Sequence, residues 1–418
     1  MKKRHPLDAA TELPRDAARR LVGAMAHPLN QPILSTDGAR VAEAHPMLSP
    51  PTGGPLPEPQ ACRYRRMWLD AHGTWASGQA GRECEAQGMF GWSAIYEVDA
   101  YERVLRGRLP DEALPAPGIV DEGCLHAAND CEVRLTEALP GSYGEHAVRR
   151  HRAVRAAWQG AGWIRPHIGK AKGERPPNPM TARARWQLFD ILRDSLVAPA
   201  LAALLVLCWS RLATPAFWTA VVLSVFFLPA LLGSLVALVD RPHDAPWRQH
   251  LDSWARGARV PLVRAALATS FLPHAAWCQL DAVVRALWRS RVSRRRRLEW
   301  RPAALARPAR VVANNWLTMW FAPALAVATS LLLTFANPYS LFTAAPVLLV
   351  WFLSPLLAWW TSLPQRAQPR LPAARQTGLQ RLARRSWSFF EDHAGPANNW
   401  LPPESVQAVS YTHLTLPT

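Results

Sequence analysis

Two apolar blocks constrain this chain more than any other feature of its sequence. Residues 196–239 and 316–361 hold almost no charged side chain, whereas arginines concentrate directly beside them. A run of roughly 20 apolar residues is long enough to cross a hydrocarbon core about 30 Å thick. Buried helices of a soluble protein are the alternative, but four separate stretches are poor in charge. We therefore predict four membrane-spanning helices, at residues 196–213, 215–239, 316–336 and 339–360.

The basic residues predict how these helices are oriented. Lys and Arg are frequent in residues 145–194, 240–315 and 365–385, whereas the short links within the two helix pairs carry only Arg211 beside them. Cytoplasmic loops of membrane proteins carry an excess of Lys and Arg. We therefore expect the basic segments, and both soluble flanks, to lie in the cytoplasm.

Residues 261–288 form a further apolar stretch, which polar residues interrupt. The interrupting side chains are Arg264, His274, Asp281 and Arg285. A fifth span here would move a basic segment to the wrong side of the membrane. We predict instead an amphipathic helix on the cytoplasmic interface.

The formal charge of +17, from 48 Lys+Arg and 31 Asp+Glu, would suit a nucleic-acid partner. Only 19 % of residues are charged, however, and the arginine run at residues 294–297 lies close to a span. Such a run is expected to contact anionic lipid headgroups, so we predict membrane lipids and no nucleic acid as partners. The six cysteines form neither a CxxC pair nor a zinc spacing.

Residues 1–190 contain no GxGxxG, P-loop, HExxH or GxSxG motif. The spacing of Ala17, Leu21, Val22 and Met25 predicts one face of a helix. Its other candidate residues are acidic and basic. Along the chain they are Asp8, then Asp121 and Glu122, and then the string RRHRAVRAAWQ at residues 149–159.

A sugar-nucleotide transferase uses groups of these kinds. It needs carboxylates that hold Mg²⁺ or Mn²⁺ against a diphosphate, a carboxylate base for the acceptor hydroxyl, and cationic or aromatic groups for the leaving nucleotide. Isolated acidic turns and basic helix faces are also typical of solvated surface. The fragments alone leave both interpretations open.

Six stretches in order resemble one family, the cyclic β-1,2-glucan synthases of Gram-negative bacteria. They are HPLDAATELPRDAARRLVGAMAHPLNQP, IYEVDAYERVLRGRLP, DEGCLHAANDCEVRLTEALPGSY, RRHRAVRAAWQGAGWIRP, NPMTARARWQLFDILRDSLVAPA and SWSFFEDHAGPANNWLPPESVQ. The family consists of very large inner-membrane proteins. A cytoplasmic family-2 glycosyltransferase domain is set among membrane helices and is followed by a phosphorylase-like domain.

The resemblance implies a domain organisation and a bacterial inner-membrane location. Residues 1–190 resemble the C-terminal part of an α/β, GT-A-like glycosyltransferase domain, and residues 191–362 the membrane region. Residues 363–407 resemble a linker and the beginning of the phosphorylase-like region. Residues 408–418, AVSYTHLTLPT, depart from the family and resemble a translated sequencing adapter. We therefore expect a truncated gene product that lacks part of the transferase and most of the phosphorylase-like domain.

The resemblance also implies substrates and site residues. UDP-glucose and a β-glucan acceptor are the implied substrates, and Mg²⁺ or Mn²⁺ the implied cofactor. Asp8 corresponds to the metal motif, and Asp121 and Glu122 to the region of the catalytic base. Arg152, Trp158 and Gln159 remain from the motif that contacts substrate.

The departures from the family fall on the same motifs. Ala10 stands at the second metal aspartate, Gly118 and Ile119 at a histidine-aspartate pair, and Ala153 at a tryptophan. Base catalysis alone contributes about 10²–10⁴-fold to rate. We expect a β-1,2-glucan glucosyltransferase fragment with impaired or absent activity. The alternative is a non-catalytic membrane remnant that scaffolds or binds glucan.

Overall fold

The structure is a computed structural model. It describes residues 3–4, 11–34, 41–43, 45–50, 52–53, 61–72, 94–105, 119–125, 128–129, 133, 135–137, 139–168, 177–240, 246–293, 312–364, 372–396 and 400–401. Asp8, Ala10, residues 294–297 and the segment 408–418 lie outside these ranges, so the expectations about them stay predictions. The chain divides into two compact units, Met1–Gln365 and Arg366–Thr418, which are described separately.

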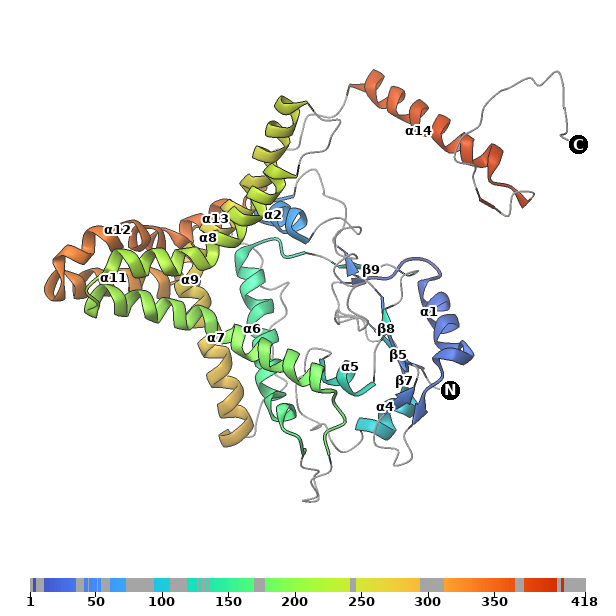
Figure 1. The fold of residues 1–418 in the computed structure, drawn as a ribbon, viewed down its shortest axis with the longest axis horizontal. Helices are drawn as coiled ribbons and strands as arrows, with labels where there is room; N and C mark the ends of the chain where they lie inside the picture. Colours follow the sequence, from blue (N-terminus) through green and yellow to red (C-terminus); the bar gives the residue numbers. More distant parts are fainter. Residues whose placement is uncertain are drawn as a thin grey trace, which may run out of the picture. The chain divides into compact units, whose positions relative to one another are not determined.

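Helices make up most of the first unit (Figure 1). They are α1 (Ala17–Ala26), α2 (Arg63–His72), α4 (Val98–Leu105), α5 (Ile119–Leu125), α6 (Tyr143–Gln159), α7 (Ala182–Arg211), α8 (Pro215–Val239), α9 (Trp247–Trp288), α10 (Val312–Thr318), α11 (Phe321–Ala336), α12 (Pro338–Phe352) and α13 (Ser354–Ser362). Short 3-10 turns are η1 (Pro28–Asn30) and η2 (Ala161–Ile164), and η3 (Arg289–Ser293) is a π-helical turn. The second unit contains α14 (Ala373–His393).

The strands are short and lie in the N-terminal part of the chain. They are β1 (Lys3–Arg4), β2 (Thr11–Glu12), β3 (Ile33–Leu34), β4 (Val41–Glu43), β5 (Met47–Ser49), β6 (Thr52–Gly53), β7 (Ile95–Glu97), β8 (Ala128–Asn129) and β9 (Leu135–Glu137). They form sheets in the orders β1-β7-β5-β8, β2-β9-β6 and β3-β4. The pairs β5–β8 and β6–β9 are parallel and the others antiparallel. The described chain is thus mostly helical with few strands, and the GT-A-like fold stays a prediction.

Helix α1 covers part of the four-stranded sheet. Leu21 and Met25 are buried in one cluster with Leu48 of β5 and Ile95 of β7. The predicted apolar face is confirmed, except that Val22 is exposed. The cluster joins segments that lie far apart in the sequence.

The first predicted helix pair is confirmed as α7 and α8, which are long and apolar enough to cross a membrane. The Thr181 hydroxyl accepts a hydrogen bond from the Ala184 amide, 3.2 Å away, and starts α7 fourteen residues before the predicted span. Pro215 begins α8 at a position where its missing N–H costs no helical hydrogen bond. Helix α7 is therefore continuous from the basic segment into the apolar block.

The predicted count of four spans is wrong, because the residues that the structure describes contain two candidate spans, or three if a bent pair counts as one. A turn at Met319 and Trp320 separates α10 from α11, which has 16 residues. At about 1.5 Å per residue, such a helix is shorter than a core about 30 Å thick. Helices α12 and α13 meet at an angle of 43°. Pro355 lies just after this break and cannot donate a backbone hydrogen bond.

The predicted interfacial helix is longer than expected, since α9 starts at Trp247 and not at residue 261. The Trp254 indole N–H donates to the Ser234 carbonyl of α8 at 2.7 Å, and His250 Nε2 lies 3.0 Å from the Leu238 carbonyl. Further along, α9 packs against α6, α7 and α11. Phe271, Leu272 and Val283 are buried in these contacts, whereas Trp247, Val284 and Trp288 of the same helix are more than half exposed. The position of α9 at the membrane interface stays a prediction.

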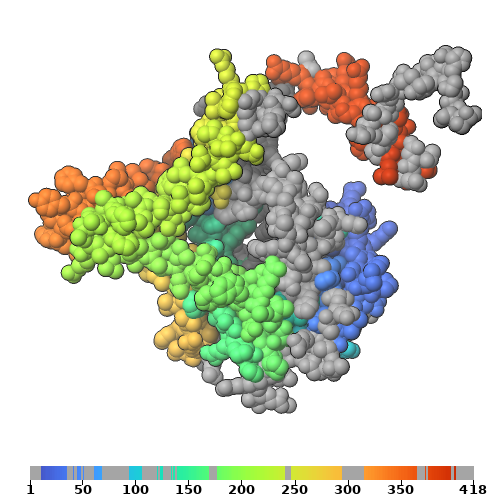
Figure 2. Space-filling model, in the orientation of Figure 1, coloured from blue at the N-terminus to red at the C-terminus, as the bar shows by residue number. Residues whose placement is uncertain are grey.

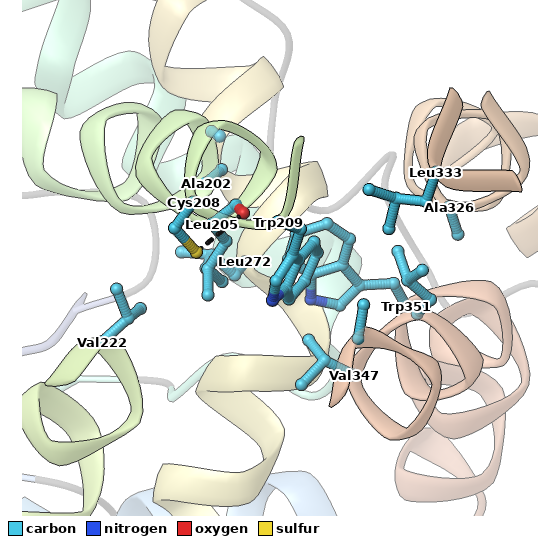
Figure 3. Packing of buried hydrophobic residues seen from close by; sticks show 13 residues of the cluster. Ala202, Leu205, Cys208, Trp209, Val222, Leu272, Ala326, Leu333, Val347 and Trp351 are labelled. Carbon is cyan, nitrogen blue, oxygen red and sulfur yellow. Dashed lines mark hydrogen bonds between the residues drawn. The ribbon is translucent and has the colours of Figure 1, made fainter. Parts of the chain in front are cut away.

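A buried cluster joins these helices around two tryptophans (Figure 3). The Trp209 and Trp351 rings lie 5.7 Å apart at 52°. The Trp209 indole donates to Thr219 Oγ1 at 2.8 Å, and the Trp351 indole donates to the Thr269 carbonyl at 3.1 Å. Both side chains are fully buried, so they fix α7 and α12 against α8 and α9.

The outer surface of α8 and of the C-terminal part of α7 is apolar, whereas the start of α7 exposes charged side chains such as Arg193 and Asp194. Both helices are coloured green to yellow-green in Figure 2. In α8 only Thr219 and Val222 are buried, while Phe217, Val236 and Val239 are more than half exposed. A helix that is apolar all round and still exposed fits a lipid environment.

Candidate functional site

Three of the predicted site residues lie on one helix, and the roles of all the predicted site residues stay predictions. Arg152, Trp158 and Gln159 lie on α6. Asp121 and Glu122 belong to α5, but the structure describes only the backbone at these two positions. The candidate site is therefore α6 together with the parts of α7 and α9 that contact it.

Helix α5 approaches α7 very closely at Gly123. A Cβ at this position would lie 2.5 Å from the Ala184 Cβ, closer than packed carbons can approach. The Thr181 amide also donates to the Gly123 carbonyl at 3.3 Å. The glycine next to the predicted base thus has a packing role, because it lets α5 lie against the start of α7.

A side-chain cap begins α6. The Ser142 hydroxyl accepts from the Glu145 amide at 3.2 Å, and Glu145 Oε2 accepts from the Gly141 amide at 2.8 Å. The first bond satisfies a backbone donor that the first helical turn leaves open, and the second holds the residue before the cap. Glu145 Oε1 also accepts from Arg149 Nη2 at 2.8 Å. The acid therefore orients the first arginine of the basic string.

A hydrogen-bond network connects the middle of α6 to α9. Asp281 lies 3.0 Å from His151 Nε2 and 2.7 Å from Arg285 Nε. Burial lowers the pKa of His151, and the bond to Asp281 opposes this only in part. Burial by itself raises the pKa of Asp281, but hydrogen bonds from Arg285 and His151 outweigh it and hold the pKa below its usual value. Asp281 is therefore a charged acceptor that holds α6 and α9 together.

A second cluster between α6 and α9 consists of neutral side chains from Tyr143, His274 and Cys278. The Tyr143 hydroxyl lies 3.0 Å from His274 Nδ1, and the Tyr143 ring stacks on Phe271 with centroids 4.0 Å apart. The thiol of Cys278 lies 3.6 Å from His274 Nε2. Burial lowers the pKa of His274 to about 4 and raises that of Cys278 to about 12. Histidine and thiol are therefore both neutral near pH 7, and the pair is not an activated nucleophile.

Trp158 joins α6 to α7. Its indole N–H donates to Ser195 Oγ at 2.9 Å, and the Ser195 hydroxyl donates to the Leu192 carbonyl at 2.6 Å. The ring packs against the cluster of Val154 with Ala282 and Val283. Trp158 therefore contributes to packing between helices, a role that the sequence did not predict.

Arginines give α6 a cationic character. Arg150 forms an ion pair with Asp194 of α7, and Arg155 is buried with 5 % of its surface exposed. Guanidinium groups are suited to bind phosphate because they offer several donors in a fixed geometry. Within the ranges that the structure describes, no group of three or more His, Cys, Asp or Glu side chains could hold a metal ion. Asp8 lies outside those ranges, so a divalent cation there stays a prediction.

Comparison with known proteins gives this arrangement a family context. No protein-family model matches the chain. Over 412 residues, 96 % of the chain, it is 29 % identical to the protein named cyclic beta-(1,2)-glucan synthase NdvB from Rhizobium meliloti (strain 1021). The resemblance to cyclic β-1,2-glucan synthases is confirmed. The matched part covers 14 % of the length of NdvB. With its candidate spans, the chain is a membrane-associated protein related to a glucan synthase.

Sequence analysis did not identify the polar contacts between α6 and α9. His274, Asp281 and Arg285 were recognised only as interruptions of an apolar stretch. Their spacing of four and seven residues places them on one helix face, which was a usable signal. Their partners, Tyr143 and His151, lie more than 120 positions earlier, and no local pattern points to them.

Proposed function

We propose that this chain is part of a membrane-bound glucosyltransferase that makes cyclic β-1,2-glucan from UDP-glucose at the bacterial inner membrane. The observation that carries the proposal is the similarity to NdvB along nearly the whole chain. The cationic helix α6, next to the first candidate span, supports it. An elongating glucan and its nucleotide-sugar donor would meet at such a boundary between soluble and apolar segments.

The proposed reaction inverts the anomeric centre. An acceptor hydroxyl of the glucan forms a bond to the anomeric carbon of glucose, and the bond from that carbon to the UDP oxygen breaks. Asp121 or Glu122 accepts the hydroxyl proton, while Arg152, Trp158 and Gln159 contact the substrates. A divalent cation near Asp8 would neutralise charge on the departing diphosphate.

We further propose that transfer by this chain is impaired. Ala10 removes one carboxylate from the metal motif, Ile119 replaces the expected aspartate, and Ala153 replaces an aromatic contact. Each loss acts on a different part of the reaction.

A non-catalytic scaffold is the second candidate, and one observation favours it. Arg150, His151 and Trp158 all contact other helices of the same chain. These side chains serve helix packing whether or not sugar is transferred.

Restoring the metal motif separates the two candidates. The full chain in lipid nanodiscs is incubated with UDP-glucose, a β-1,2-glucan acceptor and Mg²⁺ or Mn²⁺, and UDP release is measured. For an impaired transferase, Ala10→Asp raises the rate by about tenfold or more, since one metal-bound charge is regained. Ala9→Asp is the matched control, because it adds the same charge one position away. Equal and undetectable rates for both variants would support the scaffold and contradict the transferase.

A further inference from the structure

Helix α14 has two chemically distinct faces. Leu379, Leu382, Trp387 and Phe390 recur at spacings of three, five and three residues, which places them on one side of the helix. Arg381, Arg384, Arg385 and Ser388 lie on the opposite side by the same periodicity. The helix is thus amphipathic from Leu379 to Phe390.

The apolar side of α14 is exposed. Leu382 and Trp387 are 61 % and 60 % exposed, and Leu379 and Phe390 are about half exposed. The aromatic rings gather near the end of the helix, where the Trp387 and Phe390 centroids lie 6.3 Å apart. A surface of this kind needs a partner, because isolated soluble helices rarely expose an apolar stripe.

Glu391 organises the polar edge beside this aromatic group. Its Oε1 accepts from the Trp387 indole N–H at 2.8 Å and from Arg384 Nη1 at 3.0 Å. The Trp387 ring therefore presents its apolar body on one side and its polar N–H toward the charged side. Tryptophan with this orientation is typical of the boundary between headgroups and acyl chains.

The connection to the apolar block allows a membrane position. Helix α13 ends at Ser362 and α14 begins at Ala373, so about ten residues connect them. Fully extended, such a connection spans roughly 35 Å. This is long enough for α14 to lie along the membrane surface.

We propose that α14 is a membrane-surface helix, with its Leu, Trp and Phe side chains among the acyl chains and its arginines against anionic headgroups. The arginines identify the partner as an anionic lipid surface, since a protein groove for an apolar helix face does not require them. The proposal is independent of glucosyl transfer.

Hydrogen exchange of the full chain in nanodiscs tests the proposal. The nanodiscs contain phosphatidylcholine alone or mixed with phosphatidylglycerol, and the readout is exchange in peptides from residues 376–393. We expect exchange to slow by about tenfold or more in the anionic lipid, since each arginine near such a surface strengthens binding about fivefold. High salt should reverse the effect.

Three variants identify the groups responsible. Trp387→Ser with Phe390→Ser should abolish the protection. Arg384→Gln with Arg385→Gln keeps the apolar face and should remove only the dependence on anionic lipid, which separates lost lipid contact from misfolding. Ser388→Ala, on the polar side, should change nothing. Equal protection in both lipids and in detergent would mean that a protein segment covers the face. That result, or no protection in any lipid, would overturn the proposal.

Discussion

In α7 and α8 every backbone hydrogen bond joins residues close in sequence, whereas the N-terminal sheets join distant ones. Lys3 pairs with Glu97, and Leu48 pairs with Ala128. An apolar helix forms wherever its local pattern allows, because all its backbone groups are satisfied internally. Strands of two or three residues form only when the whole surrounding fold brings them together. The helical region should therefore be the more stable and the more independent of the two.

Trp351→Ala in the helical region should produce the largest effect. The change opens a void beside Trp209 and leaves the Thr269 carbonyl without its indole donor. We expect a loss of about 3–5 kcal/mol in the free energy of unfolding, measured by SDS titration in mixed micelles. Phe335→Ala is the control, since this ring of α11 is 87 % exposed. A small loss for Trp351→Ala would contradict a tightly packed helical region.

Acidification should weaken the contact of α6 with α9. The pKa of His274 is about 4 in the folded chain and 6.5 in the unfolded chain, which therefore binds the proton first. The free energy of unfolding should fall by roughly 3 kcal/mol as the pH decreases from 6.5 to 4. The lowered pKa of His151 acts in the same direction, and that of Asp281 adds a loss below its unfolded pKa of 3.8.

His274→Gln should flatten this pH dependence, because glutamine does not titrate. The groups that face this position are the Tyr143 hydroxyl, the Cys278 thiol and the Thr318 backbone. Replacing the surface residue His27 by glutamine serves as the control. An unchanged slope in His274→Gln would mean that other groups cause the acid sensitivity.

Leu21→Ala tests the stability of the N-terminal region separately from that of the helical region. We expect a loss of about 2–3 kcal/mol, near the lower end for such a change, since a small cluster can relax around the void. Hydrogen exchange should report the loss in α1 and β7 and leave α7 and α8 unaffected. Leu29→Ala, at a position 79 % exposed, is the control. Equal destabilisation of α7 and α8 would show that the two regions unfold together.

Trp158→Phe should have the smallest effect. It removes the hydrogen bond to Ser195 while it keeps an aromatic ring against Val154, so we expect a loss of about 1 kcal/mol. A double-mutant cycle with Ser195→Ala should assign most of that loss to the pair. Trp186→Phe, on the exposed side of α7, is the matched control. No coupling between Trp158 and Ser195 would contradict the packing role.

Prediction from sequence succeeded where the information is local. The hydropathy of residues 196–239 located α7 and α8, and the periodicity near Leu21 located α1. It failed at residues 316–336, because average hydropathy does not reveal the turn at Met319. The candidate site shows the same contrast between local and distant information. The sequence indicated Trp158 as a candidate, but it did not reveal the hydrogen bond of Trp158 to Ser195.

The sequence by itself determined that this chain has apolar helices flanked by arginine, and that it resembles a glucan synthase. Both follow from the order of residues along short stretches. Only the tertiary structure decided that α9 packs between α6, α7 and α8, and that Asp281 holds His151. The physical reason is distance along the chain. A helix turn needs neighbours four residues apart, whereas the partly buried hydrogen bond of His151 needs a partner 130 positions away that only folding supplies.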